Sequence, residues 1–395
     1  MIGRLLDQYY GEIVRLRHEL HRFPELGHQE EKTTETIRRY LQQAGVEILE
    51  YSLKTGVVAR VLGRVPGETL AIREDIDALP IEENTKSTFA SERSGISHAC
   101  GHDIHTAALL LTARVLNEVK DRLCGTLLLI FQPAEETCDG AAEMLAAGVL
   151  KKHPADQLIG LHCSPSVPLG KMGVISGINN AGCDVVRIEI KGKGGHGAHP
   201  EDCIDPIIAA GVLLTQMQTL ISREISPCES AVLTFGQIAA GTAPNIIPEC
   251  AELYGTLRTL NPEIRARLKA AVPRMADGCC KSMRASCLVE FERGMPPLIN
   301  DPELSERFAA ASEKILGKNS VVRLSVPSMG SDDFSCLLEQ CKNRGGQFLI
   351  GTRDQQKPET GIGLHSGANV FPDEAIGYGA AVLCQYALDT LKRQE

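Results

Sequence analysis

The feature that most constrains this chain is the alternation of short, β-rich apolar runs with segments long enough to form helices. The runs lie at residues 57–61, 70–73, 126–131 and 157–161. Helix-length segments at residues 105–119 and 141–150 separate them, and two helical patterns, at residues 5–20 and 33–44, precede them. Strands that alternate with helices predict an α/β layer fold with a mixed, largely parallel sheet.

The pattern changes near Gly182, where a second region with a different order of elements begins. Its predicted strands and helices follow the order βαββαβ, at residues 185–190, 206–220, 231–238, 250–258, 262–283 and 288–291. This order is typical of a compact α+β, ferredoxin-like sandwich. The sequence therefore predicts one domain formed by residues 1–182 and 294–395, interrupted by an inserted domain of residues 183–293.

Composition restricts the partners and the cellular compartment. A hydrophobic content of 43% in 395 residues can fill two cores. The net charge of -9 argues against a sequence-independent grip on nucleic acid. No apolar run approaches the roughly 20 residues needed to cross a bilayer, and the charged N-terminus does not resemble a signal peptide. We therefore expect a cytoplasmic protein whose 14 scattered cysteines are mostly reduced.

The first chemical motif is the segment Ser97-His-Ala-Cys-Gly-His-Asp-Ile-His105, which precedes an apolar helix. Cys100 and His102 flank a glycine, and a Cys-x-His arrangement can direct sulfur and nitrogen to one ion. A bound cation would also keep the thiolate ionised. The alternative interpretation is a buried cysteine beside a helix-capping segment, and the motif alone does not decide between the two.

The second motif is Phe131-Gln-Pro-Ala-Glu-Glu136, in which an apolar strand delivers two adjacent carboxylates to its C-terminal end. Functional sites of open α/β sheets lie at that edge. Adjacent carboxylates repel each other unless a cation or a shared proton relieves them, so Glu135 and Glu136 suit one metal ligand and one general base. A solvated acidic loop is the competing interpretation.

Two further histidines complete a possible ligand set. His162 ends an apolar strand, and His365 lies in the segment Gly363-Leu-His-Ser-Gly367. Each of them alone is more often structural. Together with Cys100, His102 and one glutamate, however, they form a set of soft and hard donors that suits zinc, manganese, cobalt or nickel.

The inserted region carries polar residues of its own. A glycine-rich turn, Gly192-Lys-Gly-Gly-His196, would let a histidine reach a reacting group, and it lacks the spacing of a phosphate-binding loop. Asn245 offers an amide donor, and the guanidinium of Arg258 matches the two oxygens of a substrate carboxylate. A turn asparagine and a surface salt bridge remain equally plausible interpretations of these two residues.

Taken in order, these segments resemble the aminoacylase, carboxypeptidase G and hippurate hydrolase family of metallopeptidases. The resemblance is to the branch with the auxin-conjugate amidohydrolases and N-acetyldiaminopimelate deacetylases, and it covers nearly the whole chain. Besides the motifs above, it includes Leu20-His-Arg-Phe-Pro-Glu-Leu26, Asp75-Ile-Asp-Ala-Leu-Pro-Ile-Glu-Glu83, Ala243-Pro-Asn245 and Gly330-Ser-Asp-Asp-Phe334.

The resemblance implies a metal-dependent amidohydrolase that cleaves N-acyl amino acids. It implies that Cys100 bridges two divalent ions and that the remaining ligands are His102, Glu136, His162 and His365. Glu135 would be the general base, the lid residue His196 would stabilise the oxyanion, and Asn245 would bind substrate. The insertion would be a lid that mediates homodimerisation. We assign Asp75 and Asp103 as groups that orient the ligands, although ordinary capping or turn roles remain open for both.

Three positions depart from the family pattern. Asp332 replaces a usual glutamate, Glu74 replaces a small residue, and Gly367 replaces a proline two residues after His365. Two other functions also remain to be weighed against metal-dependent hydrolysis. Cys100 would be the nucleophile of a cysteine amidase, with His102 or His105 as its base, or the chain would bind amino acids or peptides without catalysis.

Overall fold

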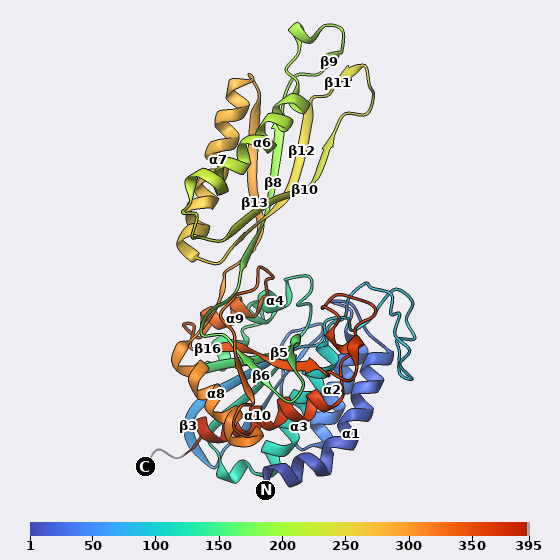
Figure 1. Ribbon diagram of the computed structural model, residues 1–395, viewed down its shortest axis with the longest axis vertical. Helices are drawn as coiled ribbons and strands as arrows, with labels where there is room; N and C mark the ends of the chain where they lie inside the picture. The colour runs from blue at the N-terminus through green and yellow to red at the C-terminus, as the bar shows by residue number, and fades with distance from the viewer. Residues whose placement is uncertain (393–395) are drawn as a thin grey trace. The chain divides into compact units, whose positions relative to one another are not determined.

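The structure of the protein is a computed structural model, and it describes residues 1–392. The chain forms two compact units, and many of their elements are labelled in Figure 1. Unit 1 comprises Met1–Gly177, Ile299–Val326 and the chain from Asp333 onward. Unit 2 comprises Ile178–Leu298 and Pro327–Asp332.

Unit 1 contains a mixed sheet of eight strands in the order β1-β2-β4-β3-β5-β16-β6-β15. The strands are β1 (Glu47–Leu49), β2 (Val57–Leu62), β3 (Val65–Asp75), β4 (Cys124–Gln132), β5 (Gln157–Pro168), β6 (Met172–Val174), β15 (Val321–Arg323) and β16 (Gly345–Arg353). At its centre, β3 runs parallel to β4 and β5, and β5 runs parallel to β16. The antiparallel pairs β1/β2, β2/β4 and β6/β16 lie around this centre. The predicted mixed, largely parallel sheet is confirmed.

Helices cover both faces of this sheet. They are α1 (Ile2–Arg22), α2 (Glu31–Gln43), α3 (His102–Glu118), α4 (Gly140–Ala146), α5 (Val149–Lys152), α8 (Pro302–Leu316), α9 (Phe334–Gln340) and α10 (Glu374–Thr390). Helix α3 packs against α1, α10 and the strands, and Leu109, Leu110 and Leu111 are all fully buried. A helix with apolar residues on every side is buried in the core of its domain. On the other face, the Phe334 ring of α9 lies against Gly160 of β5.

Two helix boundaries differ from the sequence-based expectation. Residues 141–150 form two short helices instead of one, because Gly148 adopts a left-handed conformation with φ of 82°. The helix expected to begin at His105 begins at His102, and Gly101 before it is also left-handed, with φ of 92°. As a result, His102 occupies the first turn of a buried helix.

Unit 2 contains a four-stranded antiparallel sheet in the order β10-β12-β8-β13. Its elements are β8 (Gly182–Lys191), α6 (Pro206–Glu224), β10 (Ala231–Ala240), β12 (Cys250–Thr259), α7 (Pro262–Ser282) and β13 (Ser286–Met295). The helices α6 and α7 pack on the sheet face that carries Val186, Ile188 and Ile190 (Figure 1). Each helix starts with a capping side chain, Asp205 or Asn261, followed by proline. The predicted βαββαβ sandwich is confirmed.

Two small ladders complete the topology. The strand β9 (Gly195–His196) pairs with β11 (Ile246–Ile247) within unit 2. The strand β7 (Gly177–Asn180), where the chain leaves unit 1, pairs with β14 (Leu298–Asn300), where it returns. None of the described helices combines the length and apolar character of a membrane span.

Candidate metal centre and active site

The parallel strands of unit 1 bring the predicted ligand segments to one edge of the sheet. Strand β3 ends at Asp75, and β4 ends at Gln132, a few residues before Glu135 and Glu136. His162 lies on β5, the other parallel neighbour of β3. Since the carboxyl ends of parallel strands share an edge, these side chains converge although they are distant in sequence.

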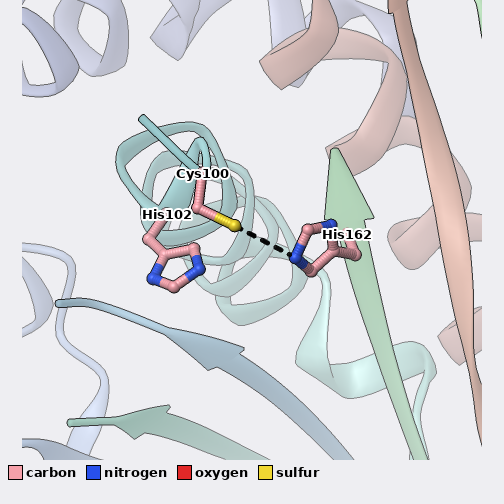
Figure 2. Close-up of side chains that lie close together, drawn as sticks. All are labelled: Cys100, His102 and His162. Carbon is pink, nitrogen blue, oxygen red and sulfur yellow. Dashed lines mark hydrogen bonds between the residues drawn. The ribbon is translucent and has the colours of Figure 1, made fainter. Parts of the chain in front are cut away.

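Cys100, His102 and His162 form the first of two ligand triads. Their donor atoms all lie within 4.8 Å of one another. The Cys100 Sγ atom is 3.5 Å from His162 Nε2, and Figure 2 shows the sulfur directed toward that ring with His102 beside it. Sulfur and imidazole nitrogen at this spacing form a typical site for a divalent ion of the zinc type.

The second triad shares the Cys100 sulfur with the first. It consists of Cys100, Glu136 and His365, whose donor atoms also lie within 4.8 Å of one another. His365 Nε2 is 3.4 Å from Glu136 Oε1. The structure therefore brings all five predicted ligands into two adjoining triads with one common atom, and a sulfur in that position can bridge two ions.

Hydrogen bonds of the two imidazoles fix which nitrogen faces the cluster. His162 Nδ1 is 2.9 Å from the Cys163 carbonyl oxygen, to which it donates, so Nε2 is the nitrogen that faces the Cys100 sulfur. His102 Nδ1 is 3.2 Å from Asp77 Oδ1 and donates in the same way. These contacts give both rings the tautomer that binds a metal through Nε2.

Asp77 contacts two of the predicted ligand segments, and the sequence analysis did not single it out. Its second oxygen accepts a hydrogen bond from the Glu136 backbone N–H at 3.0 Å, so this buried carboxylate holds two ligand segments at once. The alternation Asp75-Ile-Asp77 after an apolar strand was the available indication, because residues two apart leave a strand on the same side.

Two buried atoms of the cluster test whether the residues fit a cation. His102 Nε2 and Glu136 Oε1 are buried, and within residues 1–392 neither has a hydrogen bond of good geometry. Their charged neighbours are distant or poorly aligned: the two atoms are 3.8 Å apart, and His365 Nε2 is 3.4 Å from the glutamate oxygen. A buried polar atom without a partner costs about 1–3 kcal/mol, and more when it is charged. Both atoms lie among the other donors, where a divalent ion would satisfy them. The donor set of one thiolate, three imidazoles and one carboxylate therefore fits such ions.

The cluster favours the ionised form of its acidic members. Burial opposes ionisation of Cys100, but the charges of His162 and His102 close to the sulfur lower its pKa to about 6. Burial likewise opposes ionisation of Glu136, whose pKa is lowered by the adjacent His365 and by the charge of His102. The proximity of Cys100 and Glu136 raises the pKa of His365 to about 10. A divalent ion that displaces these protons finds anionic sulfur and oxygen already favoured.

Asp75 and Asp103 have different surroundings. Asp75 accepts hydrogen bonds from Arg73 Nη1 at 2.7 Å and from His105 Nδ1 at 2.6 Å. The other nitrogen of His105 accepts the Cys163 backbone N–H at 2.8 Å, so His105 links Asp75 to the strand that carries a predicted ligand. Burial lowers the pKa of His105 to about 4, which keeps the ring neutral. With both nitrogens engaged, His105 is a poor base for a Cys100 nucleophile.

Asp103 binds the first helix instead of a ligand. Its Oδ2 atom accepts hydrogen bonds from Arg17 Nε at 2.6 Å and from His21 Nδ1 at 2.8 Å, both on α1. Burial opposes its ionisation, but the charges of Arg17 and His21 hold its pKa well below the ordinary range. Since Asp103 follows His102 directly, these bonds anchor the start of α3.

Glu135, the predicted general base, lies beside the cluster. Its carboxylate is within 4.8 Å of donor atoms of both His102 and Glu136, and the residue is only 7% exposed. The structure thus brings the predicted general base next to two of the predicted ligands.

The polar residues predicted in the insertion all lie in unit 2, but not in one place. His196 pairs with Ile246 through the β9/β11 ladder, and the Gly197 N–H donates to the Asn245 carbonyl at 2.9 Å, so these two predicted residues are neighbours. Arg258 lies near the other end of β12, and its Nη1 donates to the Met329 carbonyl and to Ser331 Oγ, both at 3.0 Å. Within unit 2, Arg258 is thus separated from His196 and Asn245 by most of the length of a strand.

His196 presents an exposed donor. The Ala198 backbone N–H donates to His196 Nδ1 at 3.1 Å. A neutral ring with that bond carries its proton on Nε2, and the residue is exposed. The side chain can therefore donate a hydrogen bond to a reacting oxygen.

The fold and the shared-sulfur ligand cluster define a metal-dependent hydrolase. Residues 71–389 match the model of the peptidase family M20/M25/M40, and the chain belongs to this family. The metal-dependent amidohydrolase class predicted from the sequence is thereby confirmed, and the cysteine-nucleophile hypothesis loses its basis.

Similar proteins agree with this assignment. The N-acetylcysteine deacetylase of Bacillus subtilis strain 168 is 38% identical over 388 residues, which cover 97% of this chain and 99% of that protein. The N-acetyldiaminopimelate deacetylase of Bacillus cytotoxicus is 37% identical over 368 residues, covering 92% and 94%. The solved structure of the YXEP protein of Bacillus subtilis, described as a dinuclear metal-binding peptidase of the M20 family, has a TM-score of 0.82 at 35% identity and covers 98% of this chain and 99% of that one.

Proposed function

We propose that this protein hydrolyses the amide bond of N-acyl amino acids and releases a carboxylate and a free amino acid. The observation that carries the proposal is the pair of ligand triads joined at Cys100, with the Glu135 carboxylate beside them. The names of the similar deacetylases support an acylated amino acid as substrate. We propose zinc, manganese, cobalt or nickel as the metal, because sulfur and imidazole donors suit these ions.

Cys100, His102, Glu136, His162 and His365 would hold two divalent ions. When bound, such ions lower the pKa of water and polarise a carbonyl group. Glu135 would accept the proton of the attacking water and deliver it to the nitrogen of the departing amino acid. One carboxylate thereby serves both halves of the reaction, and its burial protects the transferred proton from exchange with solvent.

Unit 2 would supply the donors that recognise the substrate. The exposed Nε2–H of His196 would donate to the developing oxyanion, and the neighbouring Asn245 amide would bind the substrate. Arg258 would pair with the carboxylate of the amino acid, although its distance from Asn245 within the unit favours separate tasks for these two residues. We propose unit 1 as the catalytic domain and unit 2 as the lid.

We further propose that the lid forms a homodimer. Strand β10 is at the edge of the sheet, so within residues 1–392 one side of its backbone has no neighbouring strand. Its Val232 and Ile238 side chains, and Ile207 and Ile208 at the start of α6, are exposed apolar groups. An open edge with apolar side chains is a typical surface for pairing with a second copy. Ile238→Lys should shift the protein from dimer to monomer in light scattering coupled to size-exclusion chromatography, and an unchanged mass would contradict the proposal.

The state of the cysteines supports a cytoplasmic location. Buried cysteines such as Cys163 and Cys384 form no disulfide in the part of the chain that the structure describes. Buried free thiols are typical of proteins that fold under reducing conditions.

The test of the proposed function combines metal exchange with a substrate screen. We would deplete the protein of metal, restore zinc, manganese, cobalt or nickel separately, and measure hydrolysis of N-acetyl and N-benzoyl amino acids and of N-acetyldiaminopimelate. Activity should disappear on depletion and return with at least one ion. Absence of cleavage for every substrate and metal would overturn the proposed substrate class.

Glu135→Gln provides the matched variant. It keeps the size of the side chain and removes the base, so kcat should fall by about 10²- to 10⁴-fold. The metal content measured by mass spectrometry should not change. Retention of activity in this variant would remove Glu135 from the mechanism, whereas loss of metal would make it a ligand.

A further inference from the structure

His365 differs from the other members of the ligand cluster in its exposure. Its side chain is 52% exposed, whereas Cys100 and His102 are buried. Core packing therefore cannot hold the His365 ring as it holds the others. Its backbone is also unusual, with φ of 60°, a left-handed conformation that costs a non-glycine residue on the order of 1 kcal/mol. Apart from the contacts of the ring with Cys100 and Glu136, its position depends on the contacts of its backbone.

The first of these contacts joins His365 to the chain just before Cys100. The His365 N–H donates to the Ala99 carbonyl oxygen at 2.9 Å. Since Ala99 and Cys100 are adjacent, this bond sets the distance between the shared sulfur and the backbone of His365. This single hydrogen bond does not fix the orientation of the residues that follow His365.

The second contact lies two residues further on. The Asn84 N–H donates to the Gly367 carbonyl oxygen at 2.6 Å. At Gly367, an added Cβ would lie 1.9 Å from the Glu82 carbonyl oxygen. That atom belongs to the backbone, so no side-chain rotation would relieve the overlap. The close approach of residues 82–84 therefore requires glycine, and the proline usual at this position in the family would place a Cβ at the same point.

Residues 82–84 are themselves held firmly. They lie in a loop whose two ends are joined by reciprocal bonds between Leu79 and Ser97, each N–H donating to the other carbonyl at 3.0 Å. Ser97 Oγ also donates to the Ile81 carbonyl at 2.8 Å. Three residues after Ser97 the chain reaches Cys100, so both contacts of the His365 loop lead back to the same buried segment.

We propose that Gly367 and the backbone of residues 82–84 form a latch that positions His365 as a ligand of one of the two ions. The inference rests on the proposed function, since it takes His365 as a ligand. Gly367 and Asn84 are positioning residues that touch neither ion nor substrate. The latch uses a glycine where the family usually has proline, so it is a property of this chain.

The experiment compares two glycines of one loop. Gly367→Ala introduces the overlap, whereas Gly363→Ala is the matched control, because an added Cβ at Gly363 would have no heavy atom within 4 Å. Cobalt would be titrated into the metal-depleted full chain and followed by its absorption spectrum and by calorimetry. Gly367→Ala should weaken one of the two binding steps by about ten- to hundredfold and leave the other unchanged. Gly363→Ala should bind as the parent does.

A second pair of variants removes the hydrogen bond without adding bulk at Gly367. Asn84→Pro lacks the N–H that the Gly367 carbonyl accepts, whereas Asn84→Ala retains it. Only Asn84→Pro should weaken the same binding step. Circular dichroism and the melting temperature of the metal-free variants establish that each is folded. Wild-type binding of both ions by Gly367→Ala and Asn84→Pro would overturn the latch.

His365→Ala separates failure of the latch from failure of the proposed function. If this variant still binds two ions with the parent affinities, His365 is not a ligand and the ligand assignment fails with the latch. If it loses one binding step while Gly367→Ala and Asn84→Pro lose none, the ligand assignment stands and only the latch is wrong.

Discussion

The two compact units bury different kinds of side chain. Unit 1 encloses many ionisable groups, among them Arg17, Arg73, Asp75, Asp77, His102, Asp103 and His105. In the described residues of unit 2 the buried charged groups are Asp184 and Asp332, and its core is an apolar cluster built on Val186, Ile188 and Ile190. Buried charges stabilise a fold poorly unless they are paired, so their concentration in unit 1 indicates a functional demand.

The same difference appears in the residues proposed to act on substrate. Unit 1 holds its ligands inside a network of hydrogen bonds, whereas unit 2 presents His196 on an exposed ladder. Rigid, buried groups keep a metal geometry constant, and exposed groups on a short ladder can adapt to a ligand. Unit 1 would thus hold the metal ligands in a fixed geometry, and unit 2 would contribute side chains that can adapt to the substrate.

Arg73→Met should give the largest effect on stability. The Arg73 guanidinium donates to Asp75 at 2.7 Å, Gln132 at 2.8 Å and Asp333 at 3.0 Å, all buried. Its removal takes the buried guanidinium away from two carboxylates, which should cost about 3–5 kcal/mol of the free energy of unfolding in urea. Arg60→Met, which removes a partly exposed pair with Glu47, should cost no more than about 1 kcal/mol.

Hydrogen exchange would localise the effect of Arg73→Met. Amides of unit 1 should lose protection and those of unit 2 should keep it. An equal loss of amide protection in both units would contradict this difference between them, because it would mean that the buried network stabilises the whole chain.

Glu30→Gln should have a smaller effect that depends on pH. Glu30 is fully buried, its Oε1 accepts the Ala134 N–H at 2.7 Å, and burial raises the pKa of its carboxyl group. The folded state therefore retains a proton that the unfolded chain has lost. The stability from this group is complete below the unfolded pKa and is lost as the pH rises through the folded pKa.

Glutamine keeps the acceptor oxygen but does not titrate. Relative to the parent, Glu30→Gln should gain stability as the pH rises from 4.5, the ordinary pKa of glutamate, to the raised folded pKa, by about 1.4 kcal/mol for each unit by which the pKa is raised. Urea unfolding across this range provides the measurement. A difference that is constant with pH would show that Glu30 is not desolvated in solution.

Ile188→Val tests the apolar core of unit 2 and should have the smallest effect. Ile188 is fully buried, and removal of one methylene group should cost about 0.5–1.5 kcal/mol. Exchange should rise in unit 2 alone, and metal binding should stay at the parent level. A change in metal affinity would show that the core of unit 2 influences the ligand cluster.

Much of the fold followed from local sequence patterns. The apolar strands at residues 126–131 and 157–161 and the βαββαβ order of the insertion were predictable, because period and length distinguish strands from helices. The division of residues 141–150 into two helices was not, because a left-handed Gly148 is not distinguishable by sequence from a glycine tolerated within a helix.

The ligand cluster was predictable from the sequence, whereas the residues that support it were not. Cys100, Glu136 and the histidines are residue types with few structural uses at strand ends, so their order along the chain indicated a site. Asp77 and His105 act through hydrogen bonds to partners far away in sequence, such as His102 and Cys163, and no local pattern reports those contacts. The departure at Glu74 is explained only by coordinates, which show it accepting the Leu161 N–H of β5 at 2.9 Å.

The strands through which the chain departs from unit 1 and returns to it, β7 and β14, are hydrogen-bonded neighbours. Because the two ends of this inserted segment are adjacent, a short turn could join them and give a continuous chain without the insertion. All five proposed ligands are encoded outside residues 178–298. Mutations, deletions or replacements confined to residues 178–298 therefore leave all five proposed ligands unchanged. Such changes offer an evolutionary route from one acyl specificity to another.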